Sequence, residues 1–195
     1  MFNHVFEISY IVGMVVGSGI RAWYGKKHRQ DRLAIFRREG FITGFLASLW
    51  GIAILLPFIY IYSSWLDVAN YRIPTWSSFI GIMAFGISLW LLWRSHVDLG
   101  RNWSATTEIK ESHRLVTQGV FRYIRHPMYA AHLLWGIAQA LLIQNYIAGL
   151  ASLVVFVPLY LLRVAREERM MLIEFGDDYR AYMSRTGRIV PSLKR

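Results

Sequence analysis

Two groups of polar residues in this chain have the types and spacing that suit binding of charged ligands. Arg125, His126, Pro127 and Tyr129 form the sequence R-H-P-x-Y at the start of a long apolar segment. Proline favours the first turn of a helix and moves its predecessor out of helical geometry, so His126 is expected beside unpaired backbone N–H groups, which attract anions such as carboxylates. An ordinary helix start at a membrane surface, with Arg and His facing lipid phosphates, would give the same pattern.

The second group follows the apolar segment and contains Arg163, Glu167 and Glu168. Two adjacent carboxylates at a membrane surface could bind a cation or a ribose diol. Alternatively, Arg163 and Glu167 are four residues apart and could simply pair along one helix face. Outside these two groups, His113 precedes a turn expected at Gly119, and by itself it is typical of a solvated loop.

Several other kinds of site are not supported by the sequence. The chain has no cysteine, which excludes disulfides, thiolate metal sites and cysteine nucleophiles. Its 6 histidines are scattered and form no H-E-x-x-H motif, so no metal is predicted. No G-x-S-x-G elbow for a nucleophilic serine occurs. Gly13, Gly17 and Gly19 resemble part of a dinucleotide fingerprint, but no strand precedes them, and G-x-x-x-G spacing also suits close helix packing in a membrane.

The composition indicates a small membrane protein with a basic face. Of 195 residues, 55% are hydrophobic, yet the net charge is +10. These values conflict for a soluble globule but agree for a protein whose apolar helices lie in lipid and whose basic segments meet anionic headgroups. A nucleic-acid patch in the basic segment 21–38 is the less favoured interpretation, because apolar segments flank it, and no nucleic-acid partner is predicted.

Apolar segments of helical length predict an all-α, integral membrane fold with five transmembrane helices in a single domain, residues 1–195. A span needs roughly 17–25 residues. The 36 residues from Pro127 to Leu162 contain no charge, are too long for one helix, and have Gln144-Asn145 near their middle, which predicts a helical hairpin. Pro158 is expected to kink its second helix. The predicted spans are 4–20, 40–62, 76–93, 127–143 and 146–162.

Positive charges predict how this fold is oriented. Of 22 Lys and Arg residues, 21 fall on one side of the five-span arrangement. The positive-inside rule makes that side the cytoplasm, with the N-terminus outside and the C-terminus inside, in the inner membrane if the source is a prokaryote. The cytoplasmic segments 94–126 and 163–195 flank the hairpin and are expected to meet at its mouth.

Taken in order, these motifs resemble the isoprenylcysteine carboxyl methyltransferase family. The order is L-G-R-N-W-S, H-R-L-V, Gly119, R-H-P-M-Y, an apolar hairpin, R-x-x-x-E-E and F-G-D-D-Y, and it covers residues 99–191. R-H-P-x-Y alone also resembles phospholipid N-methyltransferases and some membrane sterol reductases, whereas the ordered set ending in F-G-D-D-Y is more specific. The first two spans contain no matching motif.

The resemblance implies S-adenosylmethionine as methyl donor, bound on the cytosolic side without a Rossmann domain. Arg163 is implied as the catalytic residue that holds the substrate carboxylate, with Arg125 as a further substrate contact. Phe121 stands where the family usually has Tyr, so one polar contact to the cofactor is missing. The implied cofactor-binding residues are His113, Arg114, Leu115, Val116, Phe121, His126, Pro127, Met128, Tyr129, Glu167 and Glu168.

The chemistry of the implied reaction agrees with these residue types. Glu167 offers an acceptor, the helix start at Pro127 an anion site, and Tyr129 a π face for a cation. A carboxylate is already ionised near neutral pH, so its methylation needs no general base. Methylation of a phospholipid amine would need a base, and Arg163 is poorly suited to it. A transporter or lipid-binding scaffold would need polar residues deep in its spans. A prenylcysteine-like or other lipophilic carboxylate is therefore the expected acceptor, with membrane lipids around it.

Overall fold

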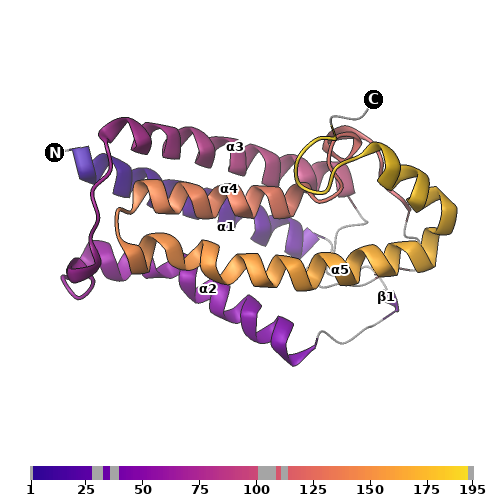
Figure 1. The fold of residues 1–195 in the computed structure, drawn as a ribbon, viewed down its shortest axis with the longest axis horizontal. Coiled ribbons are helices and arrows are strands. Elements are labelled where there is room, and N and C mark those ends of the chain that lie inside the picture. The colour runs from indigo at the N-terminus through magenta and orange to yellow at the C-terminus, as the bar shows by residue number, and fades with distance from the viewer. Residues whose placement is uncertain (1, 28–32, 36–39, 101–108, 111–113, 193–195) are drawn as a thin grey trace.

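The chain folds into a bundle of long helices (Figure 1). The computed structural model describes residues 2–27, 33–35, 40–100, 109–110 and 114–192. The described residues include five α-helices, which confirms the all-α prediction: α1 (Phe2–Lys27), α2 (Phe41–Tyr62), α3 (Thr75–Leu99), α4 (Pro127–Leu142) and α5 (Tyr146–Arg185). They also include the 3-10 helices η1 (Asp67–Ala69) and η3 (Gly119–Arg122) and two short antiparallel strands, β1 (Leu33–Ile35) and β2 (Ile109–Lys110).

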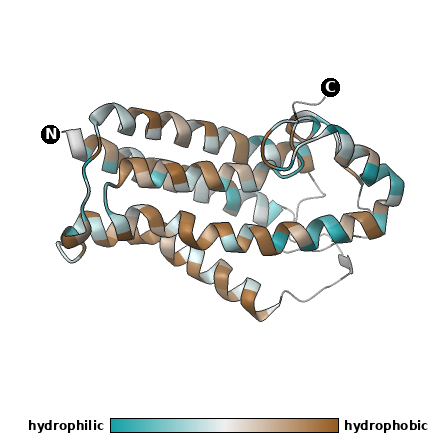
Figure 2. Cartoon of the chain, viewed as in Figure 1, coloured by the Kyte–Doolittle hydropathy of each residue, from teal (hydrophilic) through white to brown (hydrophobic). Residues whose placement is uncertain are grey.

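The helices have the length and surface of membrane-spanning segments. Four of them, α1, α2, α3 and α5, are long and apolar enough to cross a bilayer. The fifth, α4, has 16 residues, which at 1.5 Å per residue is about 24 Å, a little less than the hydrocarbon thickness. Hydrophilic residues gather in the C-terminal half of α5 (Figure 2). Large apolar side chains such as Phe41 and Met83 are exposed on the bundle surface, as lipid contact requires. The chain is an integral membrane protein.

The hairpin helix α4 lies at the centre of the bundle, between α3 and α5, while α1 packs on α3 and α4 and α2 packs on α5 (Figure 1). The close approach of α1 depends on its glycines. A Cβ atom on Gly13 would lie 2.3 Å from the ring of Phe85, and one on Gly17 would lie 2.3 Å from the ring of Trp135. The G-x-x-x-G spacing therefore serves helix packing. The alternative, a dinucleotide-binding motif, would need a strand before these glycines, and the described residues have none there.

The hairpin turn lies at Gln144 and Asn145, as the sequence predicted, between the end of α4 and the start of α5. Asn145 caps α5, because its Oδ1 accepts hydrogen bonds from the backbone N–H groups of Ile147 and Ala148 at 3.0 and 2.9 Å. Its Nδ2 donates to the Leu66 carbonyl at 2.6 Å and so ties the turn to the α2–α3 connection. Side-chain capping of this kind satisfies backbone donors that a helix leaves unpaired.

Two helix boundaries differ from the sequence prediction. The first helix continues to Lys27 and the third to Leu99, because both extend past their apolar stretches into sequence that still favours helix. Arg21, which lies in the basic segment 21–38 after the predicted span 4–20, therefore belongs to the first helix.

The sharp bend in α5 is at Gly176, a feature that the sequence did not predict, while the kink expected at Pro158 stays a prediction. Gly176 is the residue of α5 with non-helical backbone angles, φ 49° and ψ −119°. This region of backbone space is open mainly to glycine. Gly176 is the glycine of F-G-D-D-Y, and after it the chain turns back toward the start of α4 (Figure 1). The motif thus contains the turn that returns the C-terminal residues to the hairpin.

Candidate active site

The C-terminal segment is fastened to the residues that precede α4. The backbone N–H of Arg125 donates to the Gly187 carbonyl, and that of His126 to the Arg188 carbonyl, each at 2.8 Å. The Tyr182 hydroxyl donates to the Phe121 carbonyl at 2.5 Å. The two polar segments that flank the hairpin in sequence therefore meet at its mouth, as the sequence predicted.

A buried carboxylate, Glu168, is the centre of an ion cluster at this junction. Arg125 donates to its Oε1 from Nε and Nη2 at 3.2 and 3.1 Å. Arg188 donates to Oε1 and Oε2 at 3.1 and 2.7 Å, and His126 Nε2 lies 3.4 Å from Oε1. The side chains of Arg125 and Glu168 are only 8% and 6% exposed. Paired guanidinium–carboxylate contacts of this kind are strong and directional.

These contacts hold Glu168 in its ionised form. Burial alone would raise the pKa of this carboxyl, but hydrogen bonds from His126 and Arg188, together with the charges of His126 and Arg125, lower its pKa from 4.5 to about 2. Arg125 also donates to the backbone carbonyls of Met183 and Thr186. The observed contacts of Arg125 and Glu168 are thus those of a brace between the α4 entry and the C-terminal segment.

The neighbouring carboxylate, Glu167, faces a different set of groups. The Tyr129 hydroxyl donates to its Oε1, and His126 Nδ1 lies 3.6 Å from its Oε2. His126 therefore lies between Glu167 and Glu168, while the Glu167 side chain remains 29% exposed. The ring of Tyr129 is 5.7 Å from that of His126 and 5.4 Å from that of Tyr160. Together they form a polar, aromatic-walled group with an acceptor that is accessible from outside.

The start of α4 adds hydrogen-bond donors to this group. Pro127 occupies the first turn, and His126 in the cap position has non-helical backbone angles, φ −124° and ψ 62°, with no side-chain cap. The first N–H groups of a helix have no intrahelical partner, and the helix dipole makes this end positive. The helix start predicted at Pro127 is confirmed, and its chemistry suits a bound carboxylate.

Two residues that the sequence did not single out as site residues lie beside it. Arg21 of α1 donates from Nη1 to His132 Nε2 at 3.0 Å. His132 lies one turn after Tyr129 on α4. A signal for Arg21 was present in the sequence: it follows Gly13 and Gly17 at intervals of four, on the helix face that packs inward.

The other predicted site residues are placed as follows. Arg163 lies one turn before Glu167 on α5 and is partly buried, so the two share one helix face. Phe121 is 7% exposed and belongs to the main apolar core. Met128 accepts a hydrogen bond from His132 through its carbonyl. Arg114, Leu115 and Val116 belong to the segment before η3, and His113 lies outside the described residues.

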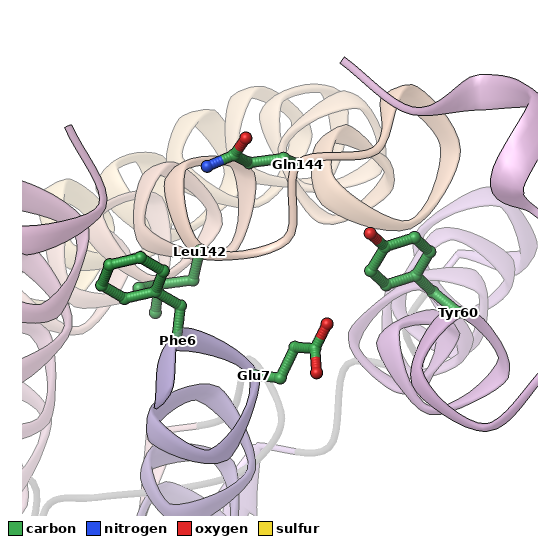
Figure 3. Close-up of a pocket in the computed structure, with 5 residues that line it drawn as sticks. All are labelled: Phe6, Glu7, Tyr60, Leu142 and Gln144. Carbon is green, nitrogen blue, oxygen red and sulfur yellow. The ribbon is translucent and has the colours of Figure 1, made fainter. Parts of the chain in front are cut away.

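A polar pocket lies at the other end of the bundle, near the hairpin turn. It is lined by Phe6, Glu7, Tyr60, Leu142 and Gln144 (Figure 3). Glu7 is the carboxylate in this lining, and it already pairs with His4 at 3.1 Å. The basic and aromatic side chains that gather at the hairpin mouth are not among its lining residues, so the candidate site remains at the mouth.

Fold and site together define a helical membrane protein with a charged, aromatic binding site at one end of a buried hairpin. Residues 79–173 match the profile of the Isoprenylcysteine carboxyl methyltransferase (ICMT) family. This range includes most of α3, all of α4 and the part of α5 that contains Arg163, Glu167 and Glu168. The resemblance of the sequence motifs to this family is therefore confirmed over these residues.

Proteins of several organisms are similar to part of this chain. Protein-S-isoprenylcysteine O-methyltransferase B of Arabidopsis thaliana is 32% identical over 97 residues, 49% of this chain and 49% of the plant protein. The Schizosaccharomyces pombe enzyme is 28% identical over 99 residues, 50% of this chain and 42% of its own. The Homo sapiens enzyme is 28% identical over 141 residues, 68% of this chain and 50% of its own. The chain thus spans about half the length of these relatives.

A solved structure has a similar fold. The structure of the eukaryotic intramembrane Ras methyltransferase ICMT superposes with a TM-score of 0.53, at 23% identity, over 80% of this chain and 54% of that one. At this identity the similarity concerns the fold. It covers more of the chain than the residues matched by the family profile.

Proposed function

We propose that the protein is an S-adenosylmethionine-dependent carboxyl O-methyltransferase acting on a prenylcysteine-like or other lipophilic carboxylate at the membrane–cytosol interface. The observation that carries this proposal is the meeting of His126, Tyr129 and Glu167 at the hairpin mouth. The match of residues 79–173 to the family profile supports the same activity. The charged end of the bundle would face the cytoplasm, because nearly all Lys and Arg residues lie on that side.

The described side chains fit the methyl donor, which when bound supplies a methyl group on a sulfonium cation. Glu167 is ionisable and partly exposed, so it can accept hydrogen bonds from an ammonium group or a ribose diol. The Tyr129 ring offers a π face to a cation, and the N–H groups at the start of α4 suit the donor's carboxylate. Arg114, Leu115, Val116 and Met128 are proposed to line the rest of the pocket, together with His113.

The proposed reaction transfers a methyl group from the sulfonium sulfur to a carboxylate oxygen. The C–S bond breaks and a C–O bond forms, which gives a thioether and a methyl ester, and no proton changes place. Arg163 is proposed to orient the carboxylate through its planar guanidinium, without proton transfer. The protein's contribution is alignment of the two reactants and exclusion of water, which in well-oriented systems is worth about 7–11 kcal/mol.

Within this proposal, Arg125 and Glu168 have a supporting role. Their contacts are to each other, to His126 and to the C-terminal segment. Their proposed effect on ligands is indirect, through the position of His126 and of the α4 start.

The test is titration of the purified protein with S-adenosylmethionine, followed by an assay of labelled methyl transfer to farnesylated cysteine and to phospholipids. Glu167→Gln should weaken donor binding by about 10-fold or more, because a charged hydrogen-bond acceptor is lost. Glu174→Gln, at an exposed position on the same helix, is the matched control and should bind as the wild type does. Absence of donor binding by the wild type would refute an enzymatic function, and transfer to phospholipid amines alone would refute the carboxylate acceptor.

A further inference from the structure

Two arginines from helices far apart in the sequence lie beside the hairpin mouth. Arg21 is near the end of α1 and donates from Nη1 to His132 Nε2 at 3.0 Å. Arg163 is on α5, one turn before Glu167. Glu167 accepts a hydrogen bond from Tyr129, which lies one turn before His132 on α4. The fold therefore gathers two guanidinium groups in one partly buried region next to Glu167 and Tyr129.

His132 positions Arg21 without neutralising its charge. The Nδ1 atom of His132 lies 2.7 Å from the Met128 carbonyl oxygen, which can only accept a hydrogen bond. Nδ1 must therefore be protonated, and Nε2 accepts from a guanidinium that can only donate. Both ring nitrogens are used in a neutral imidazole. The Arg21 side chain is thus oriented while its full positive charge is retained.

The charges around Arg21 favour an anion as ligand. Arg21 is held by a neutral imidazole, so its hydrogen bond to His132 does not neutralise its positive charge. A carboxylate bound between Arg21 and Arg163 would meet two guanidinium groups, and the planar fork of arginine matches its two oxygens.

The same region has an aromatic wall. The Trp50 ring meets that of His132 edge-on at 4.7 Å, and the Phe156 ring is 5.5 Å from that of His132. Trp50 Nε1 donates to Ser152 Oγ at 3.2 Å, which fixes the indole against α5. A ligand that joins a carboxylate to a hydrocarbon chain could place its charged end at the arginines and its apolar part along this wall.

We propose that Arg21 and Arg163 together bind the carboxylate of the methyl acceptor, with His132 as the positioning residue for Arg21. This inference rests on the proposed function and extends it to α1. Arg21 lies outside residues 79–173, which match the family profile. The first helix would therefore supply part of the substrate site in addition to anchoring the bundle through its glycines.

The test compares Arg21→Gln with wild type in the full chain, using farnesylated cysteine as acceptor. The KM for this acceptor should rise about 10- to 100-fold, since a hydrogen bond between charged groups is lost. The dissociation constant for S-adenosylmethionine should stay within about twofold of wild type. Lys27→Gln removes one positive charge from an exposed position at the same end of α1 and should leave both constants unchanged. An unchanged acceptor KM in Arg21→Gln would overturn the inference, and so would an equal loss of donor affinity, which a purely structural role predicts.

Further variants keep the inference testable if Arg21→Gln does not fold. Arg21→Lys retains the charge and the aliphatic stem but not the fork, so its KM should lie between those of wild type and Arg21→Gln. His132→Gln retains a hydrogen-bond acceptor and should keep KM closer to wild type than His132→Phe does. Equal constants in the two His132 variants would remove the positioning role.

A binding measurement separates failure of this inference from failure of the proposed function. If the wild type transfers methyl to no acceptor, the proposed function fails, but the arginine pair can still be tested. The wild type should then bind farnesylated cysteine more tightly than its carboxamide, and Arg21→Gln should have lost that preference. Equal preference in both proteins would overturn the arginine pair.

Discussion

Replacing Glu168 by glutamine tests whether the C-terminal segment is held by a buried ion cluster. The variant keeps the shape of the side chain but removes the charge that Arg125, Arg188 and His126 share. Arg125 is 8% exposed, so it would be left as a buried charge without its partner. Breaking a buried pair in this way typically costs about 3–5 kcal/mol.

The pKa of Glu168 gives an independent value for the same contribution. Its pKa falls from 4.5 to about 2 on folding, and at 1.36 kcal/mol per unit this corresponds to about 3 kcal/mol. Because the folded-state pKa is the lower one, this stabilisation is fully present above the unfolded value of 4.5 and is lost as the pH falls toward about 2. The free energy expected from breaking the buried pair and the free energy from the pKa shift are therefore of similar size.

The assay is thermal unfolding of the purified protein in detergent. For a chain of this length, Glu168→Gln should lower the Tm by roughly 10 °C at pH 7, at 2–4 °C per kcal/mol. Glu174→Gln, exposed on the same helix, should change it little. The difference between wild type and Glu168→Gln should shrink as the pH is lowered from about 4.5 to about 2, because the wild-type carboxyl then becomes protonated. A Tm change at pH 7 no larger than that of Glu174→Gln, or a difference independent of pH, would refute the reasoning.

Two further predictions concern packing and orientation. Gly17→Ala should destabilise the bundle by about 1–3 kcal/mol through overpacking against Trp135. Gly19→Ala should be tolerated, because its Cβ atom would meet nothing within 4 Å. Unfolding of the two variants in detergent measures the difference. Because the chain has no cysteine, single-cysteine variants report which side each end faces. In spheroplasts a membrane-impermeant maleimide should label Ser64→Cys directly and Asp177→Cys only after permeabilisation, and the reverse pattern would invert the predicted topology.

The pattern of charges along the chain was enough to predict the helical class, the hairpin and its turn. An uncharged stretch of 36 residues is expected to cross a bilayer as a helical hairpin, because every backbone polar group there must be hydrogen-bonded within the protein. Local signals likewise predicted the helix start at Pro127 and the G-x-x-x-G packing of Gly13 and Gly17. The ordered motifs predicted the family, although their residue roles remain proposals.

Only the tertiary structure separated the two adjacent carboxylates. Glu167 and Glu168 are identical in type and neighbours in sequence, yet successive helical positions point about 100° apart, so one meets Tyr129 and the other Arg125 and Arg188. The same holds for Arg21, which belongs by composition to a basic loop but lies against His132 because α1 continues past its apolar stretch. Contacts between residues more than 100 positions apart depend on how helices pack, and one-dimensional spacing contains no measure of that distance.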